Sequence, residues 1–382
     1  MPLDPESFDL LLSTVRRYVA ERLRPLEERV DREDEVPAEI VAEMREMGLF
    51  GLSIPEEHGG LGLSMGEEVR VALELGRTTP AFRSVFGTNV GIGSQGLVMA
   101  GSEAQKAEWL PRIASGEIVT SFALTEPGAG SDGASVQTKA VRDGDVYRLT
   151  GTKRYITNAD KASLFTVMAR TGGPGAKGVS AFLVPADLPG MSVGRPEKKM
   201  GQQGAHVCDV TFDNVPVPAV NRLGEEGEGF RIAMRVLDRG RLHIAAVCVG
   251  VAERLIVDAV AYAGERVQFG KPIASHQLVQ DLLVRCIGNI TASIGMVVRV
   301  SQMLDEGIQR DEHASLAKAF TTSRMRETVA WAREVFGGNG IVLDHDVARF
   351  FADAEAMYSY EGTREMNTLI VGRALTGKAA FV

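Results

Sequence analysis

The sequence predicts an α+β protein with a helical N-terminal part, a middle part of mostly antiparallel β strands and a C-terminal part resembling a four-helix bundle. Two observations predict this order. Apolar residues recur every three to four positions up to about residue 112 and again from about residue 230, which is the helical period. Between residues 118 and 215, short runs rich in β-branched and aromatic residues alternate with Gly, Asp, Pro and Asn, which is typical of strands and turns.

Each part contains segments with a clear pattern. In the first part, residues 9–23 and 68–77 place apolar residues on one helical face and charges on the other. Strands are expected at 136–141, 146–151, 165–170, 179–184 and 208–214. After Pro216 and Pro218, helices are expected at 230–267, 277–306, 311–336 and 363–375. We therefore expect domains at residues 1–116, 117–223 and 224–382, packed into one unit because no low-complexity linker separates them.

Composition narrows the class of protein. The chain has 382 residues, 45% of them hydrophobic, and a net charge of −8 without a Lys/Arg-rich run, which argues against nucleic acid as a partner. The longest strongly apolar stretch, Ile244–Ala252, is too short to span a bilayer. The N-terminus is acidic, unlike a secretion signal, and the three cysteines are widely separated, so we expect a cytoplasmic protein without disulfides.

A glycine-rich segment, Gly128–Gly133, matches the GxGxxG pattern of dinucleotide-binding loops. The pattern that follows is strand-like, so no helix N-terminus is available for a dinucleotide phosphate. The turn can still bring backbone N–H groups and the Ser131 hydroxyl close to an anionic or planar ligand, or it is a plain interdomain turn. No histidine pair has metal-binding spacing, and His243 is expected to be packed or solvated.

Five segments together resemble signatures of the acyl-CoA dehydrogenase family: Ala123–Asp132, Tyr155–Thr157, Arg266–Ile273, Phe336–Gly340 and Tyr360–Thr363. They occur in the family's order, and the resemblance covers essentially the whole chain. It implies FAD bound between the β part and the C-terminal bundle, an acyl-CoA substrate and a homotetramer. It also implies an electron-transfer flavoprotein as electron acceptor.

Glu361 is the candidate catalytic residue. Oxidation of an acyl thioester to its α,β-enoyl form needs a base that removes an α-proton while hydride leaves the β-carbon. Burial against flavin and acyl chain should raise the pKa of Glu361, whereas the alternative is a helix-entry residue favoured by the helix dipole. In part of the family the base lies one residue before the Arg that corresponds to Arg241. That position is Gly240 here, so Glu361 has no obvious competitor.

The resemblance also assigns binding residues. For the enolate oxygen it implies the backbone N–H of Glu361 and the flavin ribityl hydroxyl as donors. The residues implied for FAD are Phe122, Leu124, Thr125, Gly130, Ser131, Tyr155, Ile156, Thr157, Arg266, Gln268, Phe269, Gln277, Gly337, Gly338 and Thr363. Those implied for the substrate are Ser131, Arg241, Tyr360, Gly362 and Arg83, with Ser131 and Arg241 near the pantetheine and nucleotide parts of CoA.

Individual assignments have simpler alternatives. Thr125 fits a half-buried strand position, Arg266 an exposed helix end, and Arg241 a solvated charge on a helix. The sequence also departs from the family pattern, because Glu334 and Glu365 stand where the family often has Gln. An ionised carboxylate cannot donate a hydrogen bond, so these two flavin contacts are in doubt.

The segment Phe82–Ser84 resembles glutaryl-CoA dehydrogenase, in which an Arg pairs with the distal carboxylate of the substrate, and residues 369–377 resemble the same relative. Arg83 would then bind an anionic acyl tail, in glutaryl-CoA dehydrogenation or in desulfination of a sulfinoacyl-CoA; the alternative is a surface ion pair. Two further functions stay open. One is an acyl-CoA oxidase, and the other is a flavin- or CoA-binding scaffold without turnover.

Overall fold

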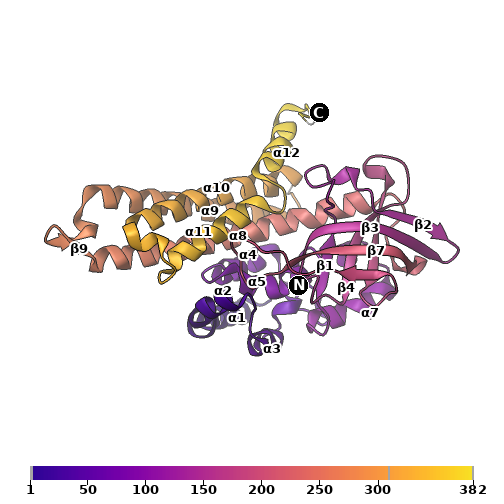
Figure 1. Ribbon diagram of the computed structural model, residues 1–382, viewed down its shortest axis with the longest axis horizontal. Helices are drawn as coiled ribbons and strands as arrows, with labels where there is room; N and C mark the ends of the chain where they lie inside the picture. The colour runs from indigo at the N-terminus through magenta and orange to yellow at the C-terminus, as the bar shows by residue number, and fades with distance from the viewer. Residues whose placement is uncertain (1–2, 309, 381–382) are drawn as a thin grey trace.

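The computed structural model describes residues 3–308 and 310–380. Along the chain come a group of N-terminal helices, a β sheet and a long helical bundle that extends away from the sheet (Figure 1). The α+β class and the helical, β, helical order expected from periodicity are confirmed.

The N-terminal helices begin where the sequence supplies caps. Ser64 and Ser102 each accept a hydrogen bond from the backbone N–H three residues later, and the side chains of Glu67 and Gln105 accept from the backbone N–H of the cap residue, which completes two capping boxes. The helices are α1 (Pro5–Tyr18), α2 (Glu27–Glu33), α3 (Ala38–Glu46), α4 (Met65–Leu75), α5 (Pro80–Val90), α6 (Gln95–Ala100) and α7 (Glu103–Ala114).

The middle part is an eight-stranded sheet in the order β6-β7-β3-β2-β4-β5-β8, with β1 also paired to β4. The strands are β1 (Thr120–Ala123), β2 (Lys139–Asp143), β3 (Val146–Thr157), β4 (Leu164–Arg170), β5 (Val179–Pro185), β6 (Met191–Val193), β7 (Val207–Pro218) and β8 (Arg222–Leu223). Most pairs are antiparallel as expected, but β1–β4 and β2–β4 are parallel. The Gly-rich turn leads through a 3-10 segment into β2, so no helix follows it.

The C-terminal part contains α8 (Gly229–Glu265), α9 (Gln277–Asp305), α10 (Asp311–Val335), α11 (Asp346–Ser359) and α12 (Arg364–Thr376), with the hairpin strands β9 (Val267–Gln268) and β10 (Lys271–Pro272) at its far end. Helix α11 was not among the helices expected from the sequence, although Val347, Phe350, Ala354 and Met357 have helical spacing and are buried. The fourth helix packed into the bundle is therefore α11. Helix α12, which was expected there, projects from the bundle (Figure 1).

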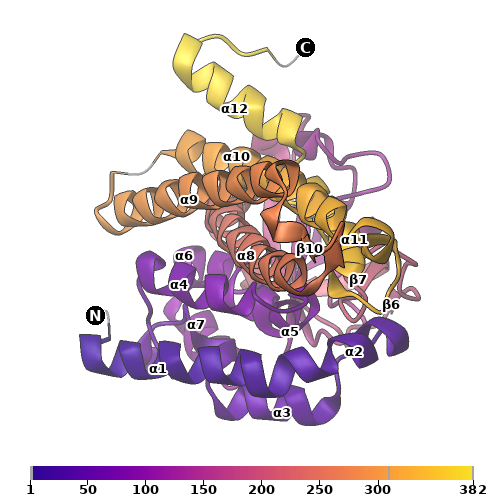
Figure 2. The same ribbon diagram turned by 90° about the vertical axis from the view of Figure 1, so that its left-hand side faces the viewer.

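Helix α8 lies between the N-terminal helices and the rest of the bundle (Figure 2). Its backbone touches α4 directly, because a Cβ on Gly250 would lie 2.1 Å from the carbonyl oxygen of Leu73 and one on Gly76 would lie 2.4 Å from that of Val247. Only glycine permits this close approach. The contact fixes the N-terminal helices against the helix that carries Gly240 and Arg241.

Helix α9 is long and apolar enough to cross a membrane by length and composition, with a mean hydropathy of 1.5 in its most apolar window. The sequence analysis did not single it out. One such helix is weak support for a membrane span, and α9 packs against α8 and α10. Only 22% of the window is buried, so the other face of α9 is an open apolar surface that includes Leu278 and Val284.

Candidate active site

Glu361 lies in the short turn between α11 and α12. Its backbone is left-handed, with φ of 54°, and so is that of Gly362, with φ of 83°. This conformation costs a residue with a side chain about 1–2 kcal/mol. The Thr363 hydroxyl then accepts a hydrogen bond of 3.2 Å from the backbone N–H of Met366 and starts α12. Thr363, expected to contact the flavin, is thus also a helix cap.

The carboxyl group of Glu361 lies against Gly240 on α8. A Cβ on Gly240 would lie 2.8 Å from Oε2 and 3.0 Å from Oε1, so any larger residue would displace the carboxyl group. Glu361 as a whole is half-buried, but its Oε2 is sealed from solvent and has no hydrogen-bond partner among the described residues. The position where part of the family carries its base therefore supplies the space for the carboxyl group of Glu361, the candidate base of this chain.

The surroundings of Glu361 favour a proton acceptor. Burial raises the pKa of Glu361, and the positive charges of Arg83, Arg241 and Lys318 oppose this shift without cancelling it. The direction agrees with the one expected from the sequence, although the burial here comes from the protein itself and not from flavin and acyl chain. A desolvated carboxylate that lacks hydrogen-bond donors is a strong base for a proton on carbon.

Arg241 is buried next to this turn, and not solvated on a helix surface. It donates to Asp238 Oδ1 at 2.8 Å and to Ser315 Oγ at 3.3 Å, while its Nε has no partner among the described residues. Burial raises the pKa of Asp238 to about 7 against the opposing charge of Arg241. The positive charge of Arg241 also acts on Glu361, where it opposes the rise in the pKa that burial causes.

Arg83, on α5, is half-buried and forms no ion pair among residues 3–308 and 310–380, so the surface ion pair considered for it is wrong. Its guanidinium group lies over Gly87, where a Cβ would come within 2.8 Å of it. One nitrogen donates to His243 Nδ1 at 3.2 Å, and His243 Nε2 lies 2.6 Å from Glu68 Oε2. His243 is thus packed: Nδ1 accepts from Arg83, which can only donate, and the Nε2–H group donates to the carboxylate of Glu68.

Tyr360 connects the turn to the β domain. Its hydroxyl accepts a hydrogen bond of 3.0 Å from the side chain of Gln202, which lies in the connection between β6 and β7. The backbone N–H of Gln202 in turn donates to the carboxylate of Asp353 on α11. The residue before the candidate base is therefore held from both the β domain and the bundle.

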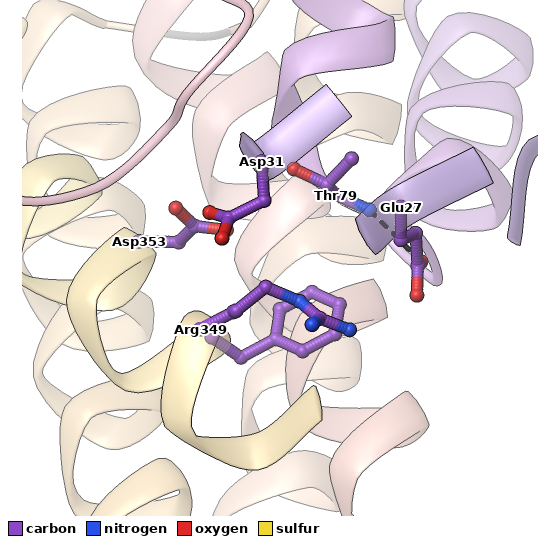
Figure 3. Close-up of a pocket in the computed structure, with 6 residues that line it drawn as sticks. Glu27, Asp31, Thr79, Arg349 and Asp353 are labelled. Atoms are coloured by element: carbon purple, nitrogen blue, oxygen red, sulfur yellow. Dashed lines mark hydrogen bonds between the residues drawn. The ribbon is translucent and has the colours of Figure 1, made fainter. Parts of the chain in front are cut away.

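Asp353 also lines a small cavity between α2 and α11, together with Asp31, Glu27, Thr79 and Arg349 (Figure 3). The cavity volume is about 10 Å³, enough for one water molecule. Burial raises the pKa of Asp353 to about 7, and the neighbouring carboxylates Asp31 and Glu27 add to the shift. This cavity is too small for a substrate and does not reach Glu361, so we regard it as an interdomain contact.

The β domain gathers one group of the residues expected to contact flavin. The backbone N–H of Arg154 donates to the carbonyl of Thr125 at 2.8 Å, which brings Thr125 beside Tyr155, Ile156 and Thr157. Tyr155 is 57% exposed, Thr125 and Thr157 are half-buried, and Phe122, Leu124 and Ile156 are buried beneath them. Gly130 and Ser131 are exposed, and a Cβ on Gly130 would meet nothing within 4 Å. The hydroxyl groups of Thr125, Tyr155 and Thr157 therefore form a partly exposed polar rim on the β domain.

The second group lies at the other end of the bundle (Figure 1). Its members are exposed, and they are Arg266, Gln268, Phe269, Gln277, Gly337 and Gly338. Helix α8 separates the two groups, and its 37 residues span about 55 Å. Residues Glu334 and Glu365 are exposed too, and Glu365 pairs with Arg364 at 3.2 Å. One chain therefore does not bring the two groups together around a single ligand.

Family models match nearly the whole chain. The model described as acyl-CoA dehydrogenase, N-terminal domain, matches residues 5–117, the middle-domain model matches 121–215, and the C-terminal-domain model matches 227–376. The chain belongs to the acyl-CoA dehydrogenase family. It is accordingly an enzyme, an oxidoreductase acting on CH–CH bonds, and its family implies a flavin cofactor.

Relatives match it over almost their entire length. An acyl-CoA dehydrogenase of Bacillus subtilis (strain 168) is 35% identical over 96% of this chain and 97% of its own. A chain of the electron transferring flavoprotein structure of Acidaminococcus fermentans has a TM-score of 0.95 and 34% identity, covering 99% of this chain and 100% of that one. The structure of glutaryl-CoA dehydrogenase from Mycobacterium smegmatis has a TM-score of 0.94 and 34% identity, and the match covers 100% of this chain and 97% of that one.

Several residues of the site were not expected from the sequence. Gln202, Glu68 and Lys318 reach the site from the β domain, α4 and α10. Only Lys318 carries a signal in the sequence, because it shares a helical face with Ala314 and Thr322, both buried. A charged residue on an apolar face indicates a buried partner.

Proposed function

We propose that this enzyme oxidises an acyl-CoA thioester to its α,β-enoyl form, with Glu361 as the general base. The observation that supports this most directly is Oε2 of Glu361, which is sealed from solvent and lacks a hydrogen-bond donor among the described residues, in a carboxyl group whose pKa burial raises. Ionised carboxylates in proteins are normally hydrogen-bonded. An exception in a desolvated site is typical of a group that exchanges a proton.

The turn supplies two groups for removal of the α-proton: a base that accepts the proton, and a hydrogen-bond donor for the thioester oxygen. Glu361 accepts the proton through its carboxylate, and its own backbone N–H is expected to donate to the thioester oxygen as negative charge develops there. The charges of Arg83, Arg241 and Lys318 oppose the rise in the pKa of Glu361 that burial causes, and so favour its ionised form. When bound, FAD supplies the acceptor for the hydride that leaves the β-carbon, at its N5 atom.

The separation of the two flavin-contacting groups supports binding of FAD by more than one chain. The rim around Thr125 and Tyr155 would contact the isoalloxazine ring, and Arg266 and Gln277 of a neighbouring chain would contact the pyrophosphate and adenine. Arginine suits the pyrophosphate because its fork donates to paired oxygens. We therefore propose a homotetramer in which contacts between chains cover the open face of α9. We also propose that the enzyme is located in the cytoplasm and that an electron-transfer flavoprotein accepts its electrons.

The test is an anaerobic titration of the purified yellow protein with linear, branched and dicarboxylic acyl-CoAs, following loss of flavin absorbance. We expect at least one acyl-CoA to bleach the flavin. The variant Glu361→Gln should slow bleaching about 10³-fold and leave flavin content and thioester affinity nearly unchanged. Wild-type rates in this variant would contradict the role of Glu361, and absence of bleaching with every acyl-CoA would favour a scaffold without turnover.

Reoxidation of the bleached enzyme in air distinguishes dehydrogenase from oxidase. A dehydrogenase should form little hydrogen peroxide unless an acceptor is added, because its reduced flavin is shielded from oxygen. Peroxide formed at the rate of substrate oxidation would indicate an acyl-CoA oxidase.

A second candidate function is favoured by Arg83. Its guanidinium group is close enough to Glu361 to lower the pKa of that residue, yet it has no carboxylate partner among the described residues. A half-buried cation without a counter-ion is suited to an anion carried by the substrate. We propose that acyl-CoAs with an anionic tail, such as glutaryl-CoA or a sulfinoacyl-CoA, are candidate substrates.

The variant Arg83→Met tests this second function. We expect it to raise KM for glutaryl-CoA at least 10-fold while changing KM for a linear acyl-CoA of the same length by less than about 3-fold. Equal losses for both substrates would reject selective binding of an anionic tail.

A further inference from the structure

Lys318 lies in the interior of α10 and contacts the backbone on both sides of Glu361. Its ammonium group donates to the carbonyl oxygens of Tyr358 and Gly362, at 2.8 Å in each case. Its exposed fraction is 0%, and it forms no ion pair among residues 3–308 and 310–380. A buried ammonium group without a carboxylate is unfavourable unless another feature compensates for it.

The compensation comes from the backbone of the turn. Tyr358 is close to the end of α11, where carbonyl groups lack helical partners and the helix dipole is negative. Gly362 follows Glu361, and its carbonyl oxygen also accepts a hydrogen bond of 3.0 Å from the side-chain amide of Asn367. Lys318 therefore joins two carbonyl groups that bracket the left-handed residue.

We propose that Lys318 is a positioning residue for the base: its ammonium group holds the turn from Tyr358 to Gly362 so that the carboxyl group of Glu361 stays against Gly240. The proposal rests on the proposed role of Glu361 in removing the α-proton. Lys318 itself need not touch the substrate. Its charge has a second effect, because it opposes the rise in the pKa of Glu361 that burial causes.

A purely structural role for Lys318 predicts a different result from a positioning role. If Lys318 only stabilised the fold, its loss would lower the folded fraction and leave kcat per folded, flavin-containing enzyme unchanged. If it positions the base, kcat falls while KM is nearly constant. Removal of the positive charge also raises the pKa of Glu361, so the rising limb of the kcat–pH profile moves to higher pH.

The experiment uses the holoenzyme of Lys318→Met, which keeps most of the side-chain stem and removes the donors. With the acyl-CoA that bleaches wild type fastest, we expect kcat to fall about 100-fold, KM to change less than about 3-fold and the pH profile to shift upward. Exchange of the substrate α-proton in D₂O should slow by the same factor as kcat. The control is Lys106→Met, which removes a lysine paired with Glu103 on the surface of α7 and should match wild type.

A second variant, Lys318→Ala, keeps the proposal testable if Lys318→Met folds poorly. Lys318→Ala lacks the atoms from Cγ to Nζ, so n-propylammonium fits the space left. We expect this cation to restore kcat in a saturable manner at least 10-fold, and neutral n-propanol, of similar shape, to restore none. Rescue by both additives to the same extent would overturn the proposal, because it would show that only volume matters.

Other outcomes separate this proposal from the proposed function. Wild-type kcat and pH profile in Lys318→Met would overturn the positioning role alone, provided that Glu361→Gln is inactive. Wild-type α-proton exchange in Glu361→Gln would overturn the proposed function, whatever Lys318 does. Failure of both Lys318 variants to fold with bound flavin would also reject the proposal, since Lys318 would then be a folding residue.

Discussion

Glu361 and Glu68 both face α8, yet their pKa values move in opposite directions. Burial acts to raise the pKa of Glu68, but Arg239 and His243 outweigh it and hold the pKa below the usual value. Both contacts are direct, since one carboxylate oxygen accepts from Arg239 and the other lies 2.6 Å from His243 Nε2. Around Glu361 the cations act without a hydrogen bond to Oε2, and burial prevails.

The difference shows that burial is outweighed at Glu68, where the charges of Arg239 and His243 act in direct contact with the carboxylate, and prevails at Glu361, where no cation among the described residues donates a hydrogen bond to Oε2. Glu126 agrees with this, because it accepts from Lys153 and from the backbone N–H groups of Gln137 and Thr138, and its pKa is lowered although burial opposes the shift. Glu68 and Glu126 therefore fix structure. Glu361 is left able to exchange a proton.

The largest expected effect comes from removing the charge of the structural carboxylate. Glu68→Gln should lower the free energy of unfolding by about 2–4 kcal/mol near neutral pH, because Arg239 and His243 then lack the buried negative charge that they contact. The pKa of Glu68 is lowered in the folded state, so its contribution is present above the ordinary pKa of about 4.3 and is lost as pH falls below it. Urea unfolding of Glu68→Gln and wild type at pH 7 and pH 4 measures both.

Glu361→Gln serves as the opposite case in the same unfolding experiment. Because the folded-state pKa of Glu361 is raised, removal of its charge should leave stability unchanged or increase it at pH 8. A similar loss of stability in both variants would break the comparison between the two residues.

The next effect concerns the space beside the base. Gly240→Ala adds a Cβ within 2.8 Å of the Glu361 carboxyl group, so this group must shift, and we expect kcat to fall about 10- to 100-fold. The fold should tolerate the change because alanine favours the interior of α8. Stopped-flow flavin reduction measures the effect, and Gly372→Ala on α12, where a Cβ meets nothing within 4 Å, is the matched control. Unchanged reduction in Gly240→Ala would mean that the carboxyl group need not stay against α8.

The smallest effect tests a carboxylate that has acidic neighbours. The pKa of Asp353 is raised to about 7, so the stability that its protonated form provides is present below the ordinary value of 3.8 and is lost as pH rises through 7. Asn resembles the protonated form and can still accept from Gln202. Asp353→Asn should raise the midpoint of thermal unfolding by about 2 °C at pH 8 and by less at pH 5, because only part of the loss between pH 3.8 and pH 7 has occurred there. An equal shift at both pH values would contradict titration of this group.

Much of the molecule follows from local sequence. Helical periods and strand-like alternation predicted the order of the three parts, and the segment Tyr360–Thr363 indicated the candidate base. The prediction failed where a short pattern was overlooked, as in α11. For Arg241 it left a solvated helix position open as an alternative to substrate binding, because periodicity does not show which polar positions become buried; the buried side chain excludes that alternative.

The contacts of the site depended on tertiary structure. Gly240 and Glu361 are 121 positions apart in the numbering, and no local pattern relates the missing Cβ of one to the carboxyl group of the other. Lys318 meets Tyr358 and Gly362 only because α10 packs beside the turn. The sequence by itself determined the secondary structure and the chemical groups available, since these depend on residues a few positions apart. Which of those groups became charged, desolvated or free to move a proton was decided by packing, because a pKa depends on neighbours that are close in space and distant along the chain.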